Sequence, residues 1–254
     1  MEQRERETIE ASEIEFYKNI YQNEVYNKTG NKLRLNRELT SLIKLSKQNK
    51  LRKVLSIGCG HGEFELLLSP FAETITAVDL SPDAIKLAKR KQEEKDLKNI
   101  EYRCQSFSSI DWDEKFDAII CLAFLHHVPE QDMKSFLSQA YNHLNSGGFF
   151  YSQDPNVNGI LRKIGRIILG ANYDKYHTSD ERELDIDKLI AAFKEVGFDS
   201  FLINHLDLSL IPAIYMFPKG YEWLMYLCLW SDKVWSLSPF AKWASGFALI
   251  SRKK

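Results

Sequence analysis

The chain has 254 residues, and 44% of them are hydrophobic, which is enough for a substantial core. This length predicts one α/β domain with insertions. The 34 basic and 35 acidic residues give a net charge of −1, which excludes a global basic field that would attract nucleic acid.

The start of the chain and its cysteines bear on location. Residues 1–7 are charged and lack an apolar core, so no secretory signal is expected. The four cysteines show no C-x-x-C spacing, which favours reduced thiols. We therefore predict a cytoplasmic protein.

Two helices are predicted ahead of the first strand, at Glu13–Tyr26 and Leu33–Ser46. Asn27–Asn31 is predicted to separate them. The apolar run that begins at Val54 then opens into glycines and a helical pattern, which predicts a strand, a tight turn and a helix start. A side chain at Gly58 or Gly60 would keep the backbone from approaching a ligand.

Asp79 ends the second predicted strand, where a carboxylate can accept hydrogen bonds from both hydroxyls of a ribose. Together, the glycine loop and this acid indicate a Rossmann-like unit for a nucleoside-bearing cofactor. A dinucleotide fingerprint would place its third glycine at Glu63, but the glycine comes one residue early, at Gly62. This spacing argues against NAD.

The G-x-G-x-G form at Gly58, Gly60 and Gly62 resembles the first motif of the class I S-adenosylmethionine-dependent methyltransferases. The resemblance is close over Leu51–Phe149 and loose beyond it. It implies S-adenosyl-L-methionine as cofactor and a Rossmann-like, seven-stranded, mostly parallel sheet with helices on both faces. In that family the glycine loop accommodates the methionine part, and the acid matching Asp79 holds the ribose.

A third strand is predicted at Ile100–Phe107, near which the family binds adenine. The family often has an acid there, whereas this chain offers Gln105 and Ser106. The residues that the resemblance assigns to the cofactor are Gly58, Cys59, Gly60, Gly62, Asp79, Leu80, Gln105, Ser106, Phe107, Leu122 and Ala123.

The fourth predicted strand, within Phe116–Pro129, resembles the family segment that enters the active site. It leads to His126 and His127, and histidine has the right pKa to take a proton from a hydroxyl acceptor. We predict His127 as the base and His126 as the second candidate. Neighbours on a strand end point in different directions, so one of the two is expected to face the site. The alternatives are a histidine that lines the cofactor pocket, orients substrate or is structural.

The chain then predicts a helix at Met133–Leu144, a stop signal at Asn145–Gly148 and a fifth strand at Phe149–Ser152. Asp154-Pro155-Asn156 is similar to the D-P-P-Y type of motif that serves methylation of nucleobase amino groups. The D-P-P-Y type of motif belongs after strand four, whereas this one follows strand five. Methylation of nucleobase amino groups is therefore disfavoured.

The last elements predicted are a helix at Asp185–Val196, a strand at Phe201–Asn204 that can continue to Leu208, and a strand at Gly246–Ser251. If the final strand is antiparallel, as in the family, the connection before it emerges at the carboxyl edge of the sheet. Open α/β sheets bind their ligands at that edge.

Two apolar insertions share that edge: residues 155–183 and residues 209–245, which hold four of the chain's 5 tryptophans. We predict an apolar or amphipathic acceptor, such as a lipid-linked, isoprenoid or aromatic molecule. The alternative is a small lid with the aromatic residues in its own core. Arg162, Lys163 and Arg166 lie among aliphatic residues and form a candidate face for peripheral membrane contact.

Prolines and charges interrupt residues 210–230, so no transmembrane segment is predicted. No cluster has metal-ligand spacing, and no metal is predicted. The chain is interpreted as one domain over 1–254, with a helical lid at 1–50, a cofactor-binding core at 51–152 and a substrate-side half at 153–254. It is predicted to methylate a small-molecule acceptor, at oxygen more than nitrogen. The alternatives are an NAD(P)-dependent oxidoreductase and a non-catalytic S-adenosylmethionine-binding protein.

Overall fold

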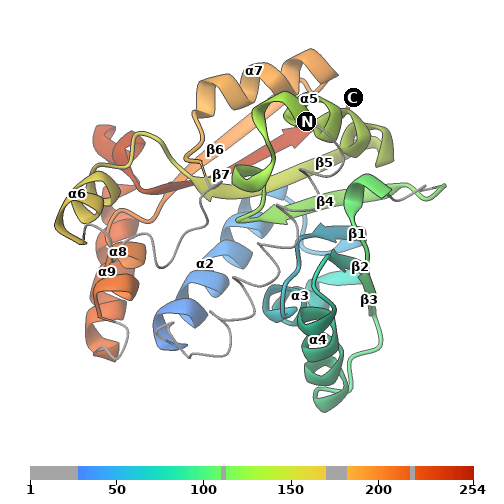
Figure 1. Cartoon of the computed structure of the whole chain (residues 1–254), viewed down its shortest axis with the longest axis horizontal. Helices are drawn as coiled ribbons and strands as arrows, with labels where there is room; N and C mark the ends of the chain where they lie inside the picture. Colours follow the sequence, from blue (N-terminus) through green and yellow to red (C-terminus); the bar gives the residue numbers. More distant parts are fainter. Residues whose placement is uncertain (1–27, 110–112, 170–181, 218–220) are drawn as a thin grey trace.

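The computed structural model describes residues 28–109, 113–169, 182–217 and 221–254. Seven strands form one sheet in the order β3-β2-β1-β4-β5-β7-β6 (Figure 1). Strands β1 to β5 pair in parallel, and β7 lies antiparallel between β5 and β6. The predicted seven-stranded, mostly parallel sheet is confirmed. The helix predicted at Glu13–Tyr26 lies outside the described residues.

The described strands and helices alternate along most of the chain. The strands are β1 (Leu51–Ile57), β2 (Ala72–Asp79), β3 (Ile100–Cys104), β4 (Phe116–Leu122), β5 (Leu144–Pro155), β6 (Ser200–Leu206) and β7 (Gly246–Arg252). The α-helices are α2 (Lys28–Ser46), α3 (Glu63–Leu68), α4 (Pro82–Glu94), α5 (Glu130–His143), α6 (Ile160–Leu169), α7 (Ile186–Val196), α8 (Leu210–Met216) and α9 (Glu222–Trp235). Short 3₁₀ turns are η1 (Ser69–Phe71), η2 (Phe107–Ser109), η3 (Leu125–His127) and η6 (Pro239–Trp243).

Helices cover both faces of the sheet, as Figure 1 shows with α2, α3 and α4 on one side and α5 and α7 on the other. One buried core packs α2, α3 and α4 against the first face, and a second packs α5 and α7 against the opposite face. Because both faces are covered, the second halves of the central strands β1 and β4 are largely apolar and buried, as parallel strands usually are.

Local sequence explains where several helices begin and end. The Ser81 hydroxyl accepts the Ala84 N–H to cap α4, and Pro82 takes the first helical position. Asp185 caps α7 through two backbone N–H groups, and Gly197 ends it with a φ of 116°. The helix predicted at Asp185–Val196 is therefore confirmed.

One predicted break is wrong. Helix α2 starts at Lys28, so Asn27–Asn31 does not separate two helices at the predicted place. Gly30 lies inside the helix. A side chain at this position would collide with Ile214 of α8, because a Cβ there would come within 2.5 Å of Ile214 Cγ1. The stop signal predicted at Asn145–Gly148 is confirmed, because α5 ends at His143. The same residues extend β5 beyond the predicted strand, since Gly147 N–H donates to Lys253 O and Lys253 N–H donates to Gly148 O.

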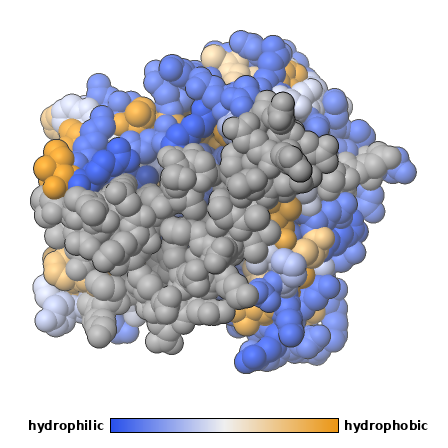
Figure 2. Space-filling model, in the orientation of Figure 1, coloured by the Kyte–Doolittle hydropathy of each residue, from blue (hydrophilic) through white to orange (hydrophobic). Residues whose placement is uncertain are grey.

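The insertion between β6 and β7 has only a small core of its own. Five buried residues form that core: Leu210, Ala213, Ile214, Met225 and Cys228. All four tryptophans of this insertion are exposed, so the alternative of a lid whose core buries the aromatic residues does not hold for them. Figure 2 shows hydrophobic atoms at the end of the molecule where α6 lies. No described helix is long and apolar enough to cross a membrane.

Candidate cofactor and active site

The glycine loop connects β1 to α3 as a tight turn. Gly58, Gly60 and Gly62 all have positive φ, at 71°, 51° and 70°. The N–H groups of Gly58 and Cys59 both donate to Val78 O, at 2.9 and 3.1 Å, so the turn folds over the end of β2. Glycine is the residue that adopts these backbone angles at least cost.

Side chains on this loop would collide with the neighbouring elements. A Cβ on Gly58 would come within 2.5 Å of Phe124 Cδ2, and a Cβ on Gly62 would overlap the hydroxyl of Tyr102. The bare backbone therefore forms a cradle at the carboxyl edge of the sheet, which fits the close approach of a ligand.

Asp79 joins the end of β2 to this loop. Its Oδ2 accepts the Gly60 N–H at 2.8 Å, and its Oδ1 accepts the Ser81 N–H at 2.9 Å. Burial raises the pKa of Asp79, while the N–H groups of Ser81, Gly60 and Leu80 oppose that shift. The side chain is only half-buried, and each carboxylate oxygen can accept a further hydrogen bond. These features fit a ribose held by its two hydroxyls.

The end of β3 lies beside Asp79. Gln105 N–H donates to Asp79 O at 2.9 Å, and the Ser106 and Ser108 hydroxyls are 2.9 Å apart. The structure thus brings Gln105 and Ser106 to the predicted adenine region. Phe107 is buried instead, with its ring centroid 4.9 Å from that of Phe136.

The remaining predicted cofactor residues lie around the loop. Cys59 is half-buried, and burial raises the pKa of its thiol, as do the nearby carboxylates of Glu65 and Asp79. Leu80 O accepts the Cys104 thiol. Leu122 ends β4, and the exposed Ala123 follows with a φ of 51°.

His126 and His127 form the η3 turn after β4, and their ring centroids lie 4.1 Å apart. His126 is buried, and its Nδ1 lies 3.0 Å from Oδ1 of the fully buried Asp154. Asp154 Oδ1 also accepts the His126 backbone N–H at 3.2 Å. His127 is half-buried and is the more exposed of the two histidines.

Burial raises the pKa of Asp154 to about 8, while the His126 backbone N–H and the positive charge of His127 oppose that shift. The same attraction acts in reverse, so the Asp154 carboxylate favours a protonated histidine beside it. The ends of β4 and β5 therefore hold a carboxylate and two imidazoles in one group. Such a group can take up and release a proton near neutral pH.

Comparison with known proteins agrees with this geometry. Residues 54–148 match the protein family described as "Methyltransferase domain". The match spans β1 to the first part of β5, and it contains the glycine loop, Asp79 and both histidines. The chain contains a class I S-adenosylmethionine-dependent methyltransferase domain.

One sequence relative of the methyltransferase domain is the "Ubiquinone biosynthesis O-methyltransferase" of Coxiella burnetii. The identity is 33% over 127 residues, which cover 49% of this chain and 51% of that relative. The chain thus matches about half the length of the curated relatives. Activity and substrate do not follow from a match over half of a protein.

Two solved structures show the same fold. The Haemonchus contortus "Phosphoethanolamine N-methyltransferase 2", in complex with S-adenosyl-L-methionine, has a TM-score of 0.60 and 16% identity over 86% of this chain and 52% of that one. The N-methyltransferase NodS of Bradyrhizobium japonicum, in complex with S-adenosyl-L-homocysteine, has a TM-score of 0.55 and 18% identity over 86% and 87%. At these identities the likeness concerns the fold of the methyltransferase domain alone.

Sequence analysis did not give Asp154 a role in the methyltransferase site. Its motif was weighed only as a D-P-P-Y type, which is defined by its place after strand four. The signal that could have found Asp154 is its position at the carboxyl end of β5, because β4 and β5 are neighbours with Leu122 paired to Gln153. An acid at that position faces the turn that carries the histidines.

A second polar cluster lies further along the same edge, at the end of β6. Arg37 Nη2 lies 2.9 Å from Glu38 Oε1 and 2.7 Å from Asp207 Oδ1, and Arg37 Nη1 lies 3.7 Å from Asp232 Oδ2. All three acids are buried. The cluster joins α2, the end of β6 and α9.

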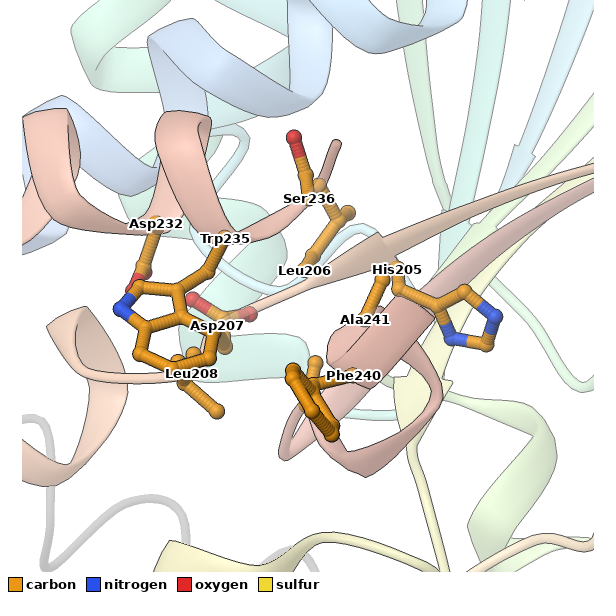
Figure 3. Close-up of a pocket in the computed structure, with 10 residues that line it drawn as sticks. His205, Leu206, Asp207, Leu208, Asp232, Trp235, Ser236, Phe240 and Ala241 are labelled. Atoms are coloured by element: carbon orange, nitrogen blue, oxygen red, sulfur yellow. The ribbon is translucent and has the colours of Figure 1, made fainter. Parts of the chain in front are cut away.

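A small hollow, lined by residues of β6, α9 and η6, opens beside this cluster. Figure 3 shows Asp207 between Trp235 and Phe240, with His205 pointing away. The Trp235 and Phe240 ring centroids are 6.1 Å apart. The hollow is separate from the glycine loop, so it is not the cofactor cradle. Among the described residues, no three His, Cys, Asp or Glu side chains are placed to hold a metal ion.

Proposed function

We propose that this chain transfers a methyl group from S-adenosyl-L-methionine to a hydroxyl oxygen of a small apolar acceptor. The observation that carries the proposal is the pairing of two features at one edge of the sheet. The loop of Gly58–Gly62 with Asp79 fits the cofactor, and Asp154 with the two histidines can take a proton.

The cofactor would supply an electrophilic methyl group on a positively charged sulfur. Asp79 would hold the ribose hydroxyls, and the open backbone at Gly60 would lie against the methionine portion. Because Asp79 is already fixed by two backbone N–H groups, its carboxylate is positioned before the ligand arrives. Such preorganisation lowers the cost of binding.

The histidines would take the proton that a hydroxyl acceptor must lose. His127 is our first candidate for the base, since it is the more exposed ring, and His126 is the second. Asp154 would act as a positioning residue, because it orients His126 through Nδ1 and stabilises positive charge on the pair. Most of the acceleration would come from holding the acceptor oxygen in line with the methyl group.

The acceptor is assigned as apolar on two grounds. Both insertions leave the sheet at the carboxyl edge, after Pro155 and after Leu206, and they carry exposed aromatic and aliphatic side chains. The sequence relatives are named for O-methylation in ubiquinone biosynthesis. A peripheral contact with membranes and a cytoplasmic location remain part of the proposal, and the four free thiols support the latter.

The first test is calorimetric titration with S-adenosyl-L-homocysteine, with NAD as the parallel ligand. We expect micromolar binding of S-adenosyl-L-homocysteine and none of NAD. Binding of NAD alone would contradict the cofactor assignment and favour the oxidoreductase alternative.

The second test follows labelled methyl transfer to phenols that carry alkyl chains of increasing length, with matched anilines for comparison. We expect methylated phenols, faster turnover with longer chains, and a large loss of turnover in His127→Ala with unchanged S-adenosyl-L-homocysteine affinity. Methylated anilines alone would move the assignment from oxygen to nitrogen. Cofactor binding without turnover on any acceptor would favour the non-catalytic alternative.

A further inference from the structure

Helix α9 exposes an uncharged stripe along one face. Five large side chains recur at helical spacing on this face, and each is at least half exposed: Trp223 (65%), Tyr226 (57%), Leu227 (50%), Trp230 (64%) and Val234 (51%). Leu237, just past the helix, is 88% exposed. Soluble monomers rarely expose so long a contiguous row of large apolar side chains.

Helix α6 adds a second apolar ridge at the same end of the molecule. Ile160, Ile164 and Ile167 are exposed, and they recur at i, i+4 and i+7 on one face. Helix α6 packs beside α8, and α8 packs on α9. Figure 1 shows the three helices together at the end opposite β3 and α4. We call the exposed apolar side chains of α6 and α9 at this end of the molecule the apolar end.

Basic residues accompany this apolar end. Lys163 and Arg166 are exposed on α6, and Lys233 and Lys242 are exposed on and after α9. The acids nearby are engaged within the protein. Glu183 pairs with Arg166 at 3.2 Å, Glu222 accepts the Thr29 hydroxyl at 2.9 Å, and Asp232 is buried. Together, α6, α9 and η6 carry five basic residues and two acids, so basic residues predominate at the apolar end of a chain whose net charge is −1.

We propose that the apolar end is a docking surface for an anionic lipid bilayer. Tryptophan and tyrosine have an apolar body with one polar group, and they gather at the boundary between headgroups and acyl chains. Aliphatic residues with flanking Lys and Arg are the composition of helices that lie in that interface. Helix α9 has 14 residues and would extend only about 21 Å, so it would lie along the surface.

A second copy of the chain is a poorer occupant of this surface. A two-fold interface brings the same patch of each copy together. Lys163, Arg166 and Lys233 of the two copies would then share one apolar interface, and like charges there repel. An anionic bilayer is complementary to the same residues.

The docking surface also suits the proposed activity, and this step rests on the proposed function. Both insertions leave the sheet at the carboxyl edge, which carries the candidate site. An acceptor dissolved in the bilayer would then reach the site without crossing water. The acceptor class implied is a membrane-resident molecule with a hydroxyl head.

Sedimentation with vesicles tests the proposal without cofactor or acceptor, so its outcome is independent of catalysis. The probes are vesicles of phosphatidylcholine with phosphatidylglycerol in equal parts, and vesicles of phosphatidylcholine alone. We expect the whole chain to bind the anionic vesicles more tightly, with a blue shift of tryptophan fluorescence. Each of Trp223→Gln and Trp230→Gln should weaken binding roughly tenfold. Combined Lys163→Gln and Lys233→Gln should remove the preference for phosphatidylglycerol.

The matched controls are Phe71→Gln, an exposed aromatic on η1 before β2, and Lys86→Gln, an exposed lysine on α4. Neither should change vesicle binding. Failure to bind either vesicle, or equal losses in the Phe71→Gln control, would overturn the proposal. So would a dimer in analytical ultracentrifugation that Trp223→Gln abolishes while vesicles bind nothing, because that result identifies a second copy as the occupant.

Discussion

At the scale of single residues, Asp79 is a position where few other residue types could form the same hydrogen bonds. Each of its oxygens accepts a backbone N–H, from Gly60 and from Ser81. An asparagine would turn an NH₂ group toward one of these donors, and it would lack the charge for the ribose hydroxyls. Asp79→Asn should therefore weaken S-adenosyl-L-homocysteine binding by about tenfold or more, as measured by calorimetry.

The matched control for that prediction is Glu73→Gln. Glu73 is an exposed acid near the other end of β2, far along the strand from the glycine loop. Its substitution should leave the affinity unchanged. Equal affinity in Asp79→Asn and the parent chain would remove Asp79 from the cofactor site.

Asp154 allows a prediction about pH. Below its pKa of about 8, Asp154 is protonated, so it no longer stabilises the positive charge that the histidine pair gains on taking the proton of the acceptor. The methyl-transfer rate with a hydroxyl acceptor should therefore rise as pH increases through about 8. Asp154→Asn should remove this transition and lower the rate at high pH by roughly a hundredfold. Asparagine still offers an oxygen to the His126 backbone N–H, so the η3 turn should persist.

Two measurements separate this role from a structural one. S-adenosyl-L-homocysteine affinity should be the same in Asp154→Asn and the parent chain. The pH dependence of the His126 ring signals in NMR should differ between them, because the carboxylate partner is gone. A pH–rate profile that keeps its transition near 8 in Asp154→Asn would contradict the assignment.

At the scale of elements, the Arg37 cluster holds α2 against the second half of the chain. Burial opposes the positive charge of Arg37, but the carboxylates of Asp207 and Glu38 more than offset it and raise its pKa. Arg37→Met would leave buried acids without their cation. We expect a loss of about 3–5 kcal/mol in the free energy of unfolding, measured by urea denaturation.

Arg90→Met is the control for the Arg37 prediction. Arg90 pairs with Glu94 four residues on in α4, and both side chains are mostly exposed. Exposed pairs of this kind contribute less than about 1 kcal/mol. A similar loss in both variants would show that Arg37 contributes no more than a surface arginine.

The sequence was informative wherever one local pattern decided the structure. The strands β1 to β4 and the helix start after the glycine loop follow from apolar runs and glycines that lie close together in the sequence. Local sequence patterns were misleading where a contact with a distant residue determined the bounds of a helix or strand. Gly30 resembles part of a break in the sequence, but its packing against Ile214 depends on a residue far along the chain. Strand β5 starts before the predicted Phe149, because Gly147 and Gly148 form hydrogen bonds with Lys253, just past β7.

The candidate site was predictable to a similar degree. The role proposed for Gly58, Gly60 and Asp79 in cofactor binding can be predicted from their spacing, since the loop and the acid belong to one continuous strand–helix–strand unit. The link between His126 and Asp154 spans two strands, so only the sheet order reveals it. Exposure of the tryptophans was not predictable either, because helical spacing alone does not say which face of α9 meets the protein.

At the scale of the whole molecule, buried acids make stability depend on pH. Burial raises the pKa of Glu65 from 4.5 to about 7, with the Ser56 hydroxyl opposing the shift. The folded state therefore binds more protons than the unfolded state between these values, and stability falls as pH rises through that window. Glu65 should contribute on the order of 3 kcal/mol to this fall, measured by denaturation at pH 5 and pH 8.

Glu65→Gln should flatten that dependence, because glutamine keeps a hydrogen-bond acceptor for Ser56 and does not titrate. Asp154 acts in the same direction, so the flattening should be partial. Stability that rises with pH in the parent chain would contradict the assignment of a raised pKa to these buried acids.

Helix α2 contacts both the helix that carries the exposed apolar stripe, α9, and the helix that follows the glycine loop, α3. Near its start, Thr29 donates to Glu222 of α9 at 2.9 Å, and Asn31 donates to Glu63 of α3 at 3.2 Å. Glu63 follows the glycine loop directly, and Glu222 begins the helix that carries the exposed stripe. Since an α-helix is stiff along its axis, a displacement of α9 would be transmitted through α2 to the first turn of α3. The two regions are thus connected through two side chains of α2, Thr29 and Asn31, which have a single residue between them.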